Sequence, residues 1–105
     1  MVSANIQNLL DRLVADYAPE KVILFGSHVS GNPRPDSDID LLIIKDTTER
    51  FIDRWVTIRR ILSDSKRTVG LETIVLTPEE VMKRLAMGDQ FISGILETGE
   101  VLYAG

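Results

Sequence analysis

Apolar residues recur along the chain with two different periods and predict helices alternating with strands. A stripe at helical spacing comes first; Ser3 can cap this helix and Pro19 ends it. The stripe consists of Ile6, Leu9, Leu10, Leu13, Val14 and Tyr17. Two short, continuous apolar runs follow, Lys21–Phe25 and Ile39–Ile44, with a loop rich in turn-forming residues between them over residues 28–37. Because continuous apolar strands are usually covered on both faces, this pattern predicts an α/β layering.

The second half of the chain continues the pattern. It predicts a helix over residues 48–63, a third strand over residues 69–76 and a last edge strand over residues 101–103. We expect the inner side of this helix to be formed by Phe51, Ile52, Trp55, Ile58 and Leu62.

Local signals predict two short helices between the third strand and the last. Thr77, Pro78 and Glu80 have the spacing of a capping box with proline at the first helical position. Asp89 can cap a second helix, which Gly99 ends. We expect that second helix to bury Phe91, Ile92, Ile95 and Leu96.

Length and composition narrow the function classes. The 105 residues suffice for one compact domain over residues 1–105, and the 44% hydrophobic content supports a real core. The absence of cysteine excludes disulfides and thiolate metal sites, and it fits the reducing cytoplasm, where we expect the protein. No apolar run is long enough to span a bilayer, and the N-terminal residues lack the pattern of a secretory signal, so we expect neither feature. A net charge of −4 makes duplex nucleic acid a poor candidate ligand.

Two aspartates stand at the start of the second predicted strand. Side chains at positions i and i+2 of a strand point to the same face, so Asp38 and Asp40 should lie side by side. Two carboxylates that close repel each other unless a cation lies between them, and Mg²⁺ prefers such oxygen ligands. Magnesium held in this way serves nucleotidyl transfer, because it can bridge phosphate oxygens. The alternative is an aspartate-rich turn whose side chains bond only to the backbone.

Gly26 and Ser27 end the first predicted strand. Glycine at a strand end lets another group approach the backbone, and a short helix after it would offer N–H groups to a phosphate. The Ser27 hydroxyl can add one hydrogen bond to a phosphate oxygen. If the first two strands are neighbours, this phosphate site and the aspartate pair meet at one edge of the sheet. The alternative is an ordinary Gly-Ser turn. His28, the only histidine, is expected to be a loop residue.

The pattern Gly26-Ser27, ten residues, then Asp38-Ile39-Asp40 resembles the G-S-x10-D-x-D signature of the nucleotidyltransferase superfamily related to DNA polymerase beta. The chain resembles the smallest members of this superfamily, the minimal nucleotidyltransferases of prokaryotes, and the likeness covers nearly its whole length. The resemblance implies a palm-like mixed sheet of about three to four strands flanked by helices. It also implies a third acidic metal ligand and catalytic residue, for which Glu72 is the candidate. The alternative is that Glu72 is a solvated edge residue.

The resemblance implies a Mg²⁺-dependent enzyme that takes ATP as substrate. Asp38, Asp40 and Glu72 would hold the metal, and Gly26 and Ser27 would position the triphosphate. A chain of this size leaves little room for an acceptor site, so we expect a second protein to supply the acceptor. In the family, that protein is often a HEPN-domain toxin, which the nucleotidyltransferase neutralises as an antitoxin by adding AMP. Two alternatives are an antitoxin that only masks its toxin and a transferase acting on a small molecule.

Overall fold

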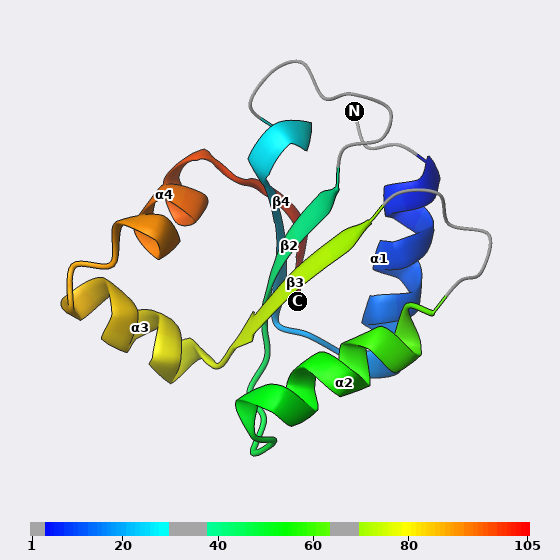
Figure 1. Cartoon of the computed structure of the whole chain (residues 1–105), viewed down its shortest axis with the longest axis horizontal. Helices are drawn as coiled ribbons and strands as arrows, with labels where there is room; N and C mark the ends of the chain where they lie inside the picture. Colours follow the sequence, from blue (N-terminus) through cyan, green and yellow to red (C-terminus); the bar gives the residue numbers. More distant parts are fainter. Residues whose placement is uncertain (1–3, 30–37, 64–69) are drawn as a thin grey trace.

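The structure is a computed structural model, and it describes residues 4–29, 38–63 and 70–105. Its centre is a four-stranded sheet with the strand order β3-β2-β1-β4 (Figure 1). The strands are β1 (Lys21–Phe25), β2 (Ile39–Ile44), β3 (Leu71–Leu76) and β4 (Glu100–Ala104). Strand β1 is antiparallel to both β2 and β4, whereas β2 and β3 are parallel. This mixed sheet confirms the predicted fold class.

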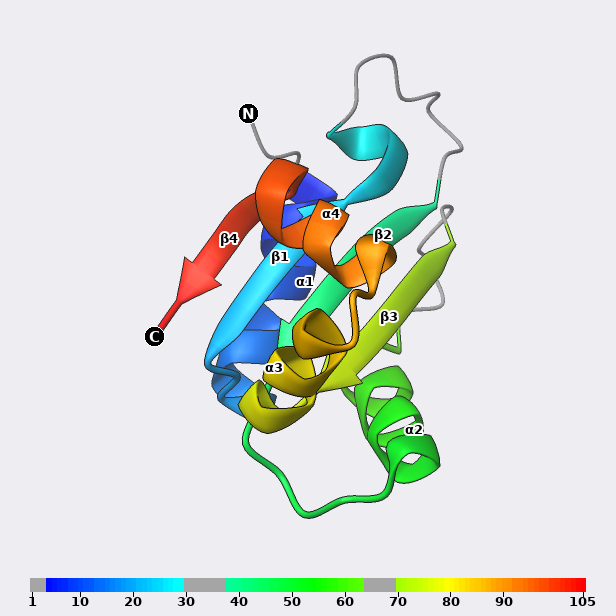
Figure 2. The ribbon, with the colours of Figure 1, turned by 90° about the vertical axis from the view of Figure 1, so that its left-hand side faces the viewer.

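Two layers of helices cover the sheet. Helices α1 (Ala4–Tyr17) and α2 (Phe51–Ile61) lie on one face, and α3 (Pro78–Ala86) and α4 (Gln90–Thr98) lie on the other (Figures 1 and 2). Alternate residues of β2 separate the two cores: Leu41 packs under α1 and α2, and Leu42 packs under α3 and α4. No helix within residues 4–29, 38–63 and 70–105 combines the length and apolar character that crossing a membrane requires.

Several predicted boundaries are confirmed. Strands β1 and β2 have the predicted limits, and β4 is an edge strand. Thr77 caps α3 in a complete capping box with Glu80, and Asp89 caps α4 by accepting hydrogen bonds from two backbone N–H groups. The expected Ser3 cap and Val69, the first residue of the third predicted strand, lie outside the described residues. Gly70 is described but lies before β3, which begins at Leu71 rather than at residue 69.

The predicted inner side of α2 is wrong for three residues. Phe51, Ile52 and Trp55 are exposed by 58%, 60% and 44%, and the helix begins at Phe51 rather than at residue 48. Of the expected set, only Ile58 and Leu62 are buried. The reason is Arg54, which takes the inward position one turn before Ile58 and is itself buried. Expectations for α4 fail in the same way, because Phe91 and Leu96 are exposed while Ile92 and Ile95 are buried.

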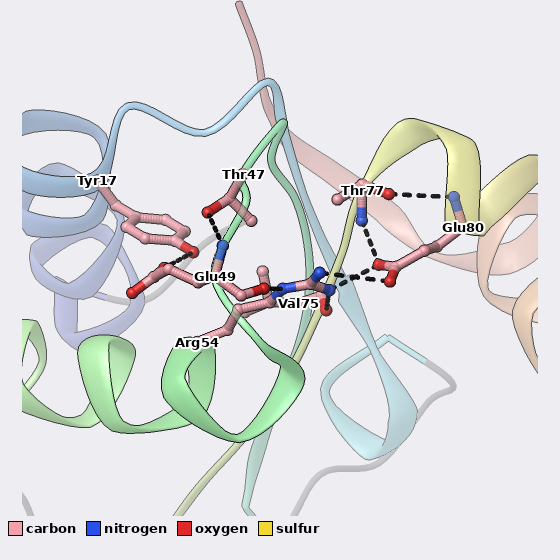
Figure 3. A network of polar contacts seen from close by, with 7 residues as sticks. All are labelled: Tyr17, Thr47, Glu49, Arg54, Val75, Thr77 and Glu80. Carbon is pink, nitrogen blue, oxygen red and sulfur yellow. Dashed lines mark hydrogen bonds and ion pairs between the residues drawn. The ribbon is translucent and has the colours of Figure 1, made fainter.

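Arg54 joins the two helical layers around the edge of the sheet (Figure 3). Its Nη1 donates to the carbonyl oxygen of Val75 on the edge strand β3 at 3.2 Å. The same nitrogen donates to Oε1 of Glu80 on α3 at 2.6 Å, and Nη2 donates to Oε2 at 3.3 Å. Its Nε donates to the carbonyl oxygen of Glu49 at 2.9 Å. A buried guanidinium is tolerated here because its donors find acceptors.

Glu49 extends this network to α1. Its carboxylate accepts hydrogen bonds from the Tyr17 hydroxyl at 3.1 Å and from the Thr57 hydroxyl at 2.6 Å. Burial, together with the hydrogen bond and the negative charge of Glu49, raises the pKa of Tyr17 to about 12. The phenol therefore stays protonated and acts as a donor at neutral pH.

Arg59 makes a second contact with the same sheet edge. Its Nη2 donates to the carbonyl oxygen of Leu71 at 2.9 Å, and its guanidinium lies 4.9 Å from the centroid of the exposed Trp55 ring. Two arginines of α2 thus occupy outward carbonyls near both ends of β3. An edge strand is thereby shielded from pairing with another chain.

We predict that Glu80→Gln destabilises the protein at neutral pH but not in acid. The hydrogen bond from Arg54 holds the pKa of Glu80 below its usual range. Because the folded-state pKa is the lower one, the stabilisation is complete above the unfolded pKa of about 4.3 and is lost as the pH falls through the folded value. Urea unfolding at pH 7 should show a loss of about 1–2 kcal/mol, allowing for partial exposure of the carboxylate to solvent.

At pH 3 the two proteins should differ by much less. The matched control is Glu79→Gln, an exposed residue one position earlier on the same helix. This control should change the free energy of unfolding by less than about 0.5 kcal/mol at either pH. Equal losses for Glu80→Gln at pH 7 and pH 3 would contradict the role of the ionised pair.

Candidate active site

The three acidic residues singled out by sequence come to one end of the sheet. Asp38 immediately precedes β2, Asp40 is its second residue, and Glu72 is the second residue of β3. In the parallel pairing of β2 with β3, Asp40 and Glu72 are direct partners. Each lies two residues before a side chain of the core under α3 and α4, namely Leu42 and Ile74. Both carboxylates therefore point to the face that α3 and α4 cover.

The Gly-Ser segment lies beside these acids. The short 3₁₀ helix η1 (Gly26–His28) follows β1 directly, and Phe25, the last residue of β1, pairs with Asp40. This confirms both the predicted short helix after the first strand and the predicted adjacency of the two strands. Figure 2 shows η1 next to the starts of β2 and β3, at the end of the sheet opposite α3.

A close approach between backbone and carboxylate shapes the site. Gly26 has a φ of 80°, in the left-handed region, and a Cβ atom built on it would overlap with Oδ2 of Asp40. A Cβ on Gly70 would likewise overlap with Oδ1 of Asp38. The two aspartates thus lean toward glycines on opposite sides of β2, one after β1 and the other before β3. Each glycine provides room that any other residue would fill.

The acids act on one another electrostatically. Burial raises the pKa of Asp40 above its usual range, and the negative charges of Asp38 and Glu72 raise it further. His28 opposes this rise. Asp40 therefore lies in a concentration of negative charge that a bound cation would relieve. His28, expected as a loop residue, belongs to η1 and is close enough to influence this carboxylate.

The donor chemistry fits magnesium, since the three side chains offer only carboxylate oxygens. The described residues nevertheless contain no group of three or more His, Cys, Asp or Glu side chains already positioned to hold a metal ion. The backbone brings Asp38, Asp40 and Glu72 to one edge, while the two aspartates lean toward different glycines. A shared cation would require their carboxylates to turn toward each other.

A family model described as polymerase beta, nucleotidyltransferase matches residues 5–104. The chain belongs to this nucleotidyltransferase family. A search of curated proteins returned no match. Nucleotidyltransferases of this superfamily typically use Mg²⁺ and nucleoside triphosphates. The family assignment supports nucleotidyltransferase activity in general and agrees with the fold.

Gly70 is the residue of this nucleotidyltransferase site that sequence reasoning missed. Its carbonyl oxygen accepts a hydrogen bond from the N–H of Ile39 at 3.0 Å, so it helps to align β3 with the start of β2. The available signal was a glycine directly before a strand that carries an acidic residue.

We predict that Gly26→Ala destabilises the nucleotidyltransferase mainly through Asp40. Alanine at positive φ costs about 1–2 kcal/mol, and the overlap with the carboxylate adds a further cost of about 1 kcal/mol or more. In an Asp40→Ala background only the backbone strain should remain. Urea unfolding of the four proteins of this double-mutant cycle measures the coupling.

Gly88→Ala is the matched control. Gly88 has a φ of 78°, nearly that of Gly26, but no atom lies within 4 Å of a Cβ built there. Its replacement should therefore cost about the same as Gly26→Ala in the Asp40→Ala background. An equal cost of Gly26→Ala with and without the Asp40 carboxylate would show that the contact does not matter.

Proposed function

We propose that the protein is a Mg²⁺-dependent nucleotidyltransferase that moves AMP from ATP to a hydroxyl group of a partner protein. The observation that supports this most is the meeting of Asp38, Asp40 and Glu72 with η1 at one end of the sheet, in a chain of the nucleotidyltransferase family. The carboxylates would bind the metal, and the glycine at the end of β1 leaves space for the Asp40 carboxylate.

Each residue has a defined task in this proposal. Asp38, Asp40 and Glu72 hold Mg²⁺, which when bound neutralises charge on the phosphate oxygens. The Ser27 hydroxyl donates a hydrogen bond to a phosphate oxygen, and Gly26 lets the triphosphate approach. Glu72 accepts the proton of the acceptor hydroxyl. The acceptor oxygen then bonds to the α-phosphorus, and the bond to the bridging oxygen breaks with release of pyrophosphate.

The surface of α2 supports a protein as the acceptor. Four apolar side chains are exposed on it: Phe51, Ile52, Trp55 and Val56. A groove of about 320 Å³ continues this surface toward α3 and is lined by Phe51, Leu76, Glu80, Lys83, Arg84 and Met87. Contiguous exposed apolar surface commonly marks a protein interface. We propose a HEPN-domain toxin as the partner, with the enzyme acting as its antitoxin in the cytoplasm.

The same surface favours a second candidate function, in which the protein neutralises a toxin by covering it. The groove lies beside Leu76, whereas the acids lie around Glu72 on the same strand. Four residues of strand separate these positions by roughly 13 Å. Partner binding could therefore proceed without the carboxylates.

We predict that wild-type protein binds Mg²⁺-ATP and that Asp38→Ala/Asp40→Ala abolishes the binding. The physical reason is the loss of both aspartate side chains that would hold the metal. Isothermal titration calorimetry measures the heat directly. The control is Asp16→Ala/Asp46→Ala, which removes two exposed acidic residues at the opposite end of the sheet and should bind as wild type does. Equal heats from wild type and the Asp38/Asp40 variant would refute the site.

A second experiment separates modification from masking. Cells that produce the toxin would receive wild type, Asp38→Ala/Asp40→Ala or Ile52→Asp, and mass mapping of the toxin would detect added AMP. For a transferase, the double variant should lose both protection and the AMP mark. For a masking protein, the double variant should still protect, whereas Ile52→Asp should not. Val101→Asp, at another exposed apolar position, is the matched control and should protect fully.

A further inference from the structure

An exposed aromatic ring lies close to the acidic end of the sheet. Phe91, the second residue of α4, is 56% exposed although the helical pattern predicted its burial. Its ring meets the ring of Phe25 edge to face, with centroids 5.8 Å apart and planes at 85°. Phe25 is half-buried and is the antiparallel partner of Asp40. A chain of two aromatic side chains therefore leads away from the carboxylate.

The spacing suits a nucleotide. Partners in an antiparallel pair carry their side chains on one face, with Cβ atoms about 4.5–5.5 Å apart. The Phe91 ring contacts the ring of Phe25, so it lies within about two side-chain lengths of Asp40. A nucleoside triphosphate held by its phosphates at the acids extends ribose and base over a similar length. The exposed part of Phe91 thus lies where the base could reach it.

We propose that Phe91, supported from below by Phe25, is the stacking platform for the nucleobase of the triphosphate. This inference rests on the proposed nucleotidyltransferase function and adds the base-binding residue to it. Base–aromatic stacking depends on the π-face that every base possesses. The site therefore accepts different bases and favours purines, which offer the larger face.

Phe91 is singled out by its neighbour rather than by exposure alone. Met87 is 73% exposed on α3, but it lines the groove beside Leu76 at the far end of β3. The Phe91 ring instead contacts the side chain that faces Asp40 across the β1–β2 pair. Its position in the first turn of α4 is held by Asp89, whose carboxylate accepts from the Phe91 N–H at 3.0 Å.

The test compares two ligands on the full chain. Mg²⁺-ATP carries a base, whereas Mg²⁺-tripolyphosphate presents only the phosphates. Phe91→Ala should weaken the affinity for ATP by about 5- to 150-fold, the range for one stacked base. Its affinity for tripolyphosphate should stay within about twofold of the wild-type value. Phe91→Leu keeps apolar bulk against Phe25 but has no π-face, so it should lose ATP affinity in the same way. Phe91→Trp should retain ATP affinity, and Met87→Ala should leave both affinities unchanged.

The outcomes distinguish the inference from the function on which it rests. If wild type binds ATP and Phe91→Ala and Phe91→Leu bind it equally well, Phe91 only packs on Phe25 and the inference is overturned. The inference is also overturned if both variants bind tripolyphosphate and ATP with equally reduced affinity, because Phe91 then acts on the shape of the acidic site. Wild type that binds neither ligand would remove the proposed function itself.

Discussion

The arrangement of helices around this sheet depends on one buried guanidinium. Arg54 starts on α2, passes the edge of β3 and ends on Glu80 of α3, so a single side chain connects the two helical layers. Glu49 continues the connection to Tyr17 on α1. Burying a charge in this way is tolerable only when its donors are matched. The network therefore defines how α2 is rotated on the sheet, and that rotation leaves the apolar residues of α2 facing outward.

The acidic end of the sheet has the opposite character. There, charges of one sign gather on adjacent strands, and Asp40 is partly buried among them. This arrangement opposes folding rather than supporting it, as is common where binding chemistry is concentrated. The fold sustains it because the far end of the same strands is stabilised by Arg54 and by two apolar cores. Stability and chemistry are thus divided between the two ends of β2 and β3.

The structural features that could be predicted are those that depend on residues close together in the sequence. Strands β1 and β2 follow from continuous apolar runs, and the α3 cap follows from a local exchange of hydrogen bonds between Thr77 and Glu80. The inner side of α2 could not be predicted, because an inward arginine depends on carbonyl oxygens of a strand that comes later in the chain. The exposure of Phe91 could not be predicted either, because helical periodicity shows that a helix has an apolar face but not how many residues of that face are buried.

The candidate site was predictable in part. The alternation of a strand predicts that Asp38 and Asp40 lie on one face at the start of β2, and the short helix after β1 was expected from the glycine. The pairing of Asp40 with Glu72 needs the parallel register of β2 and β3, which no local pattern reveals. The way the two aspartates lean over Gly26 and Gly70 is likewise a property of the assembled sheet.

Two arginines of α2 cover the β3 edge of the sheet, so the β4 edge is the one at which the sheet can be extended. Arg54 and Arg59 donate to outward carbonyls of β3, whereas β4 is the opposite edge strand of the sheet. If the β4 strands of two copies paired, the outer strands of the joined sheet would be the two copies of β3, whose carbonyls accept from Arg54 and Arg59. Assembly by strand pairing would therefore stop at a dimer, and an open-ended fibril would not form.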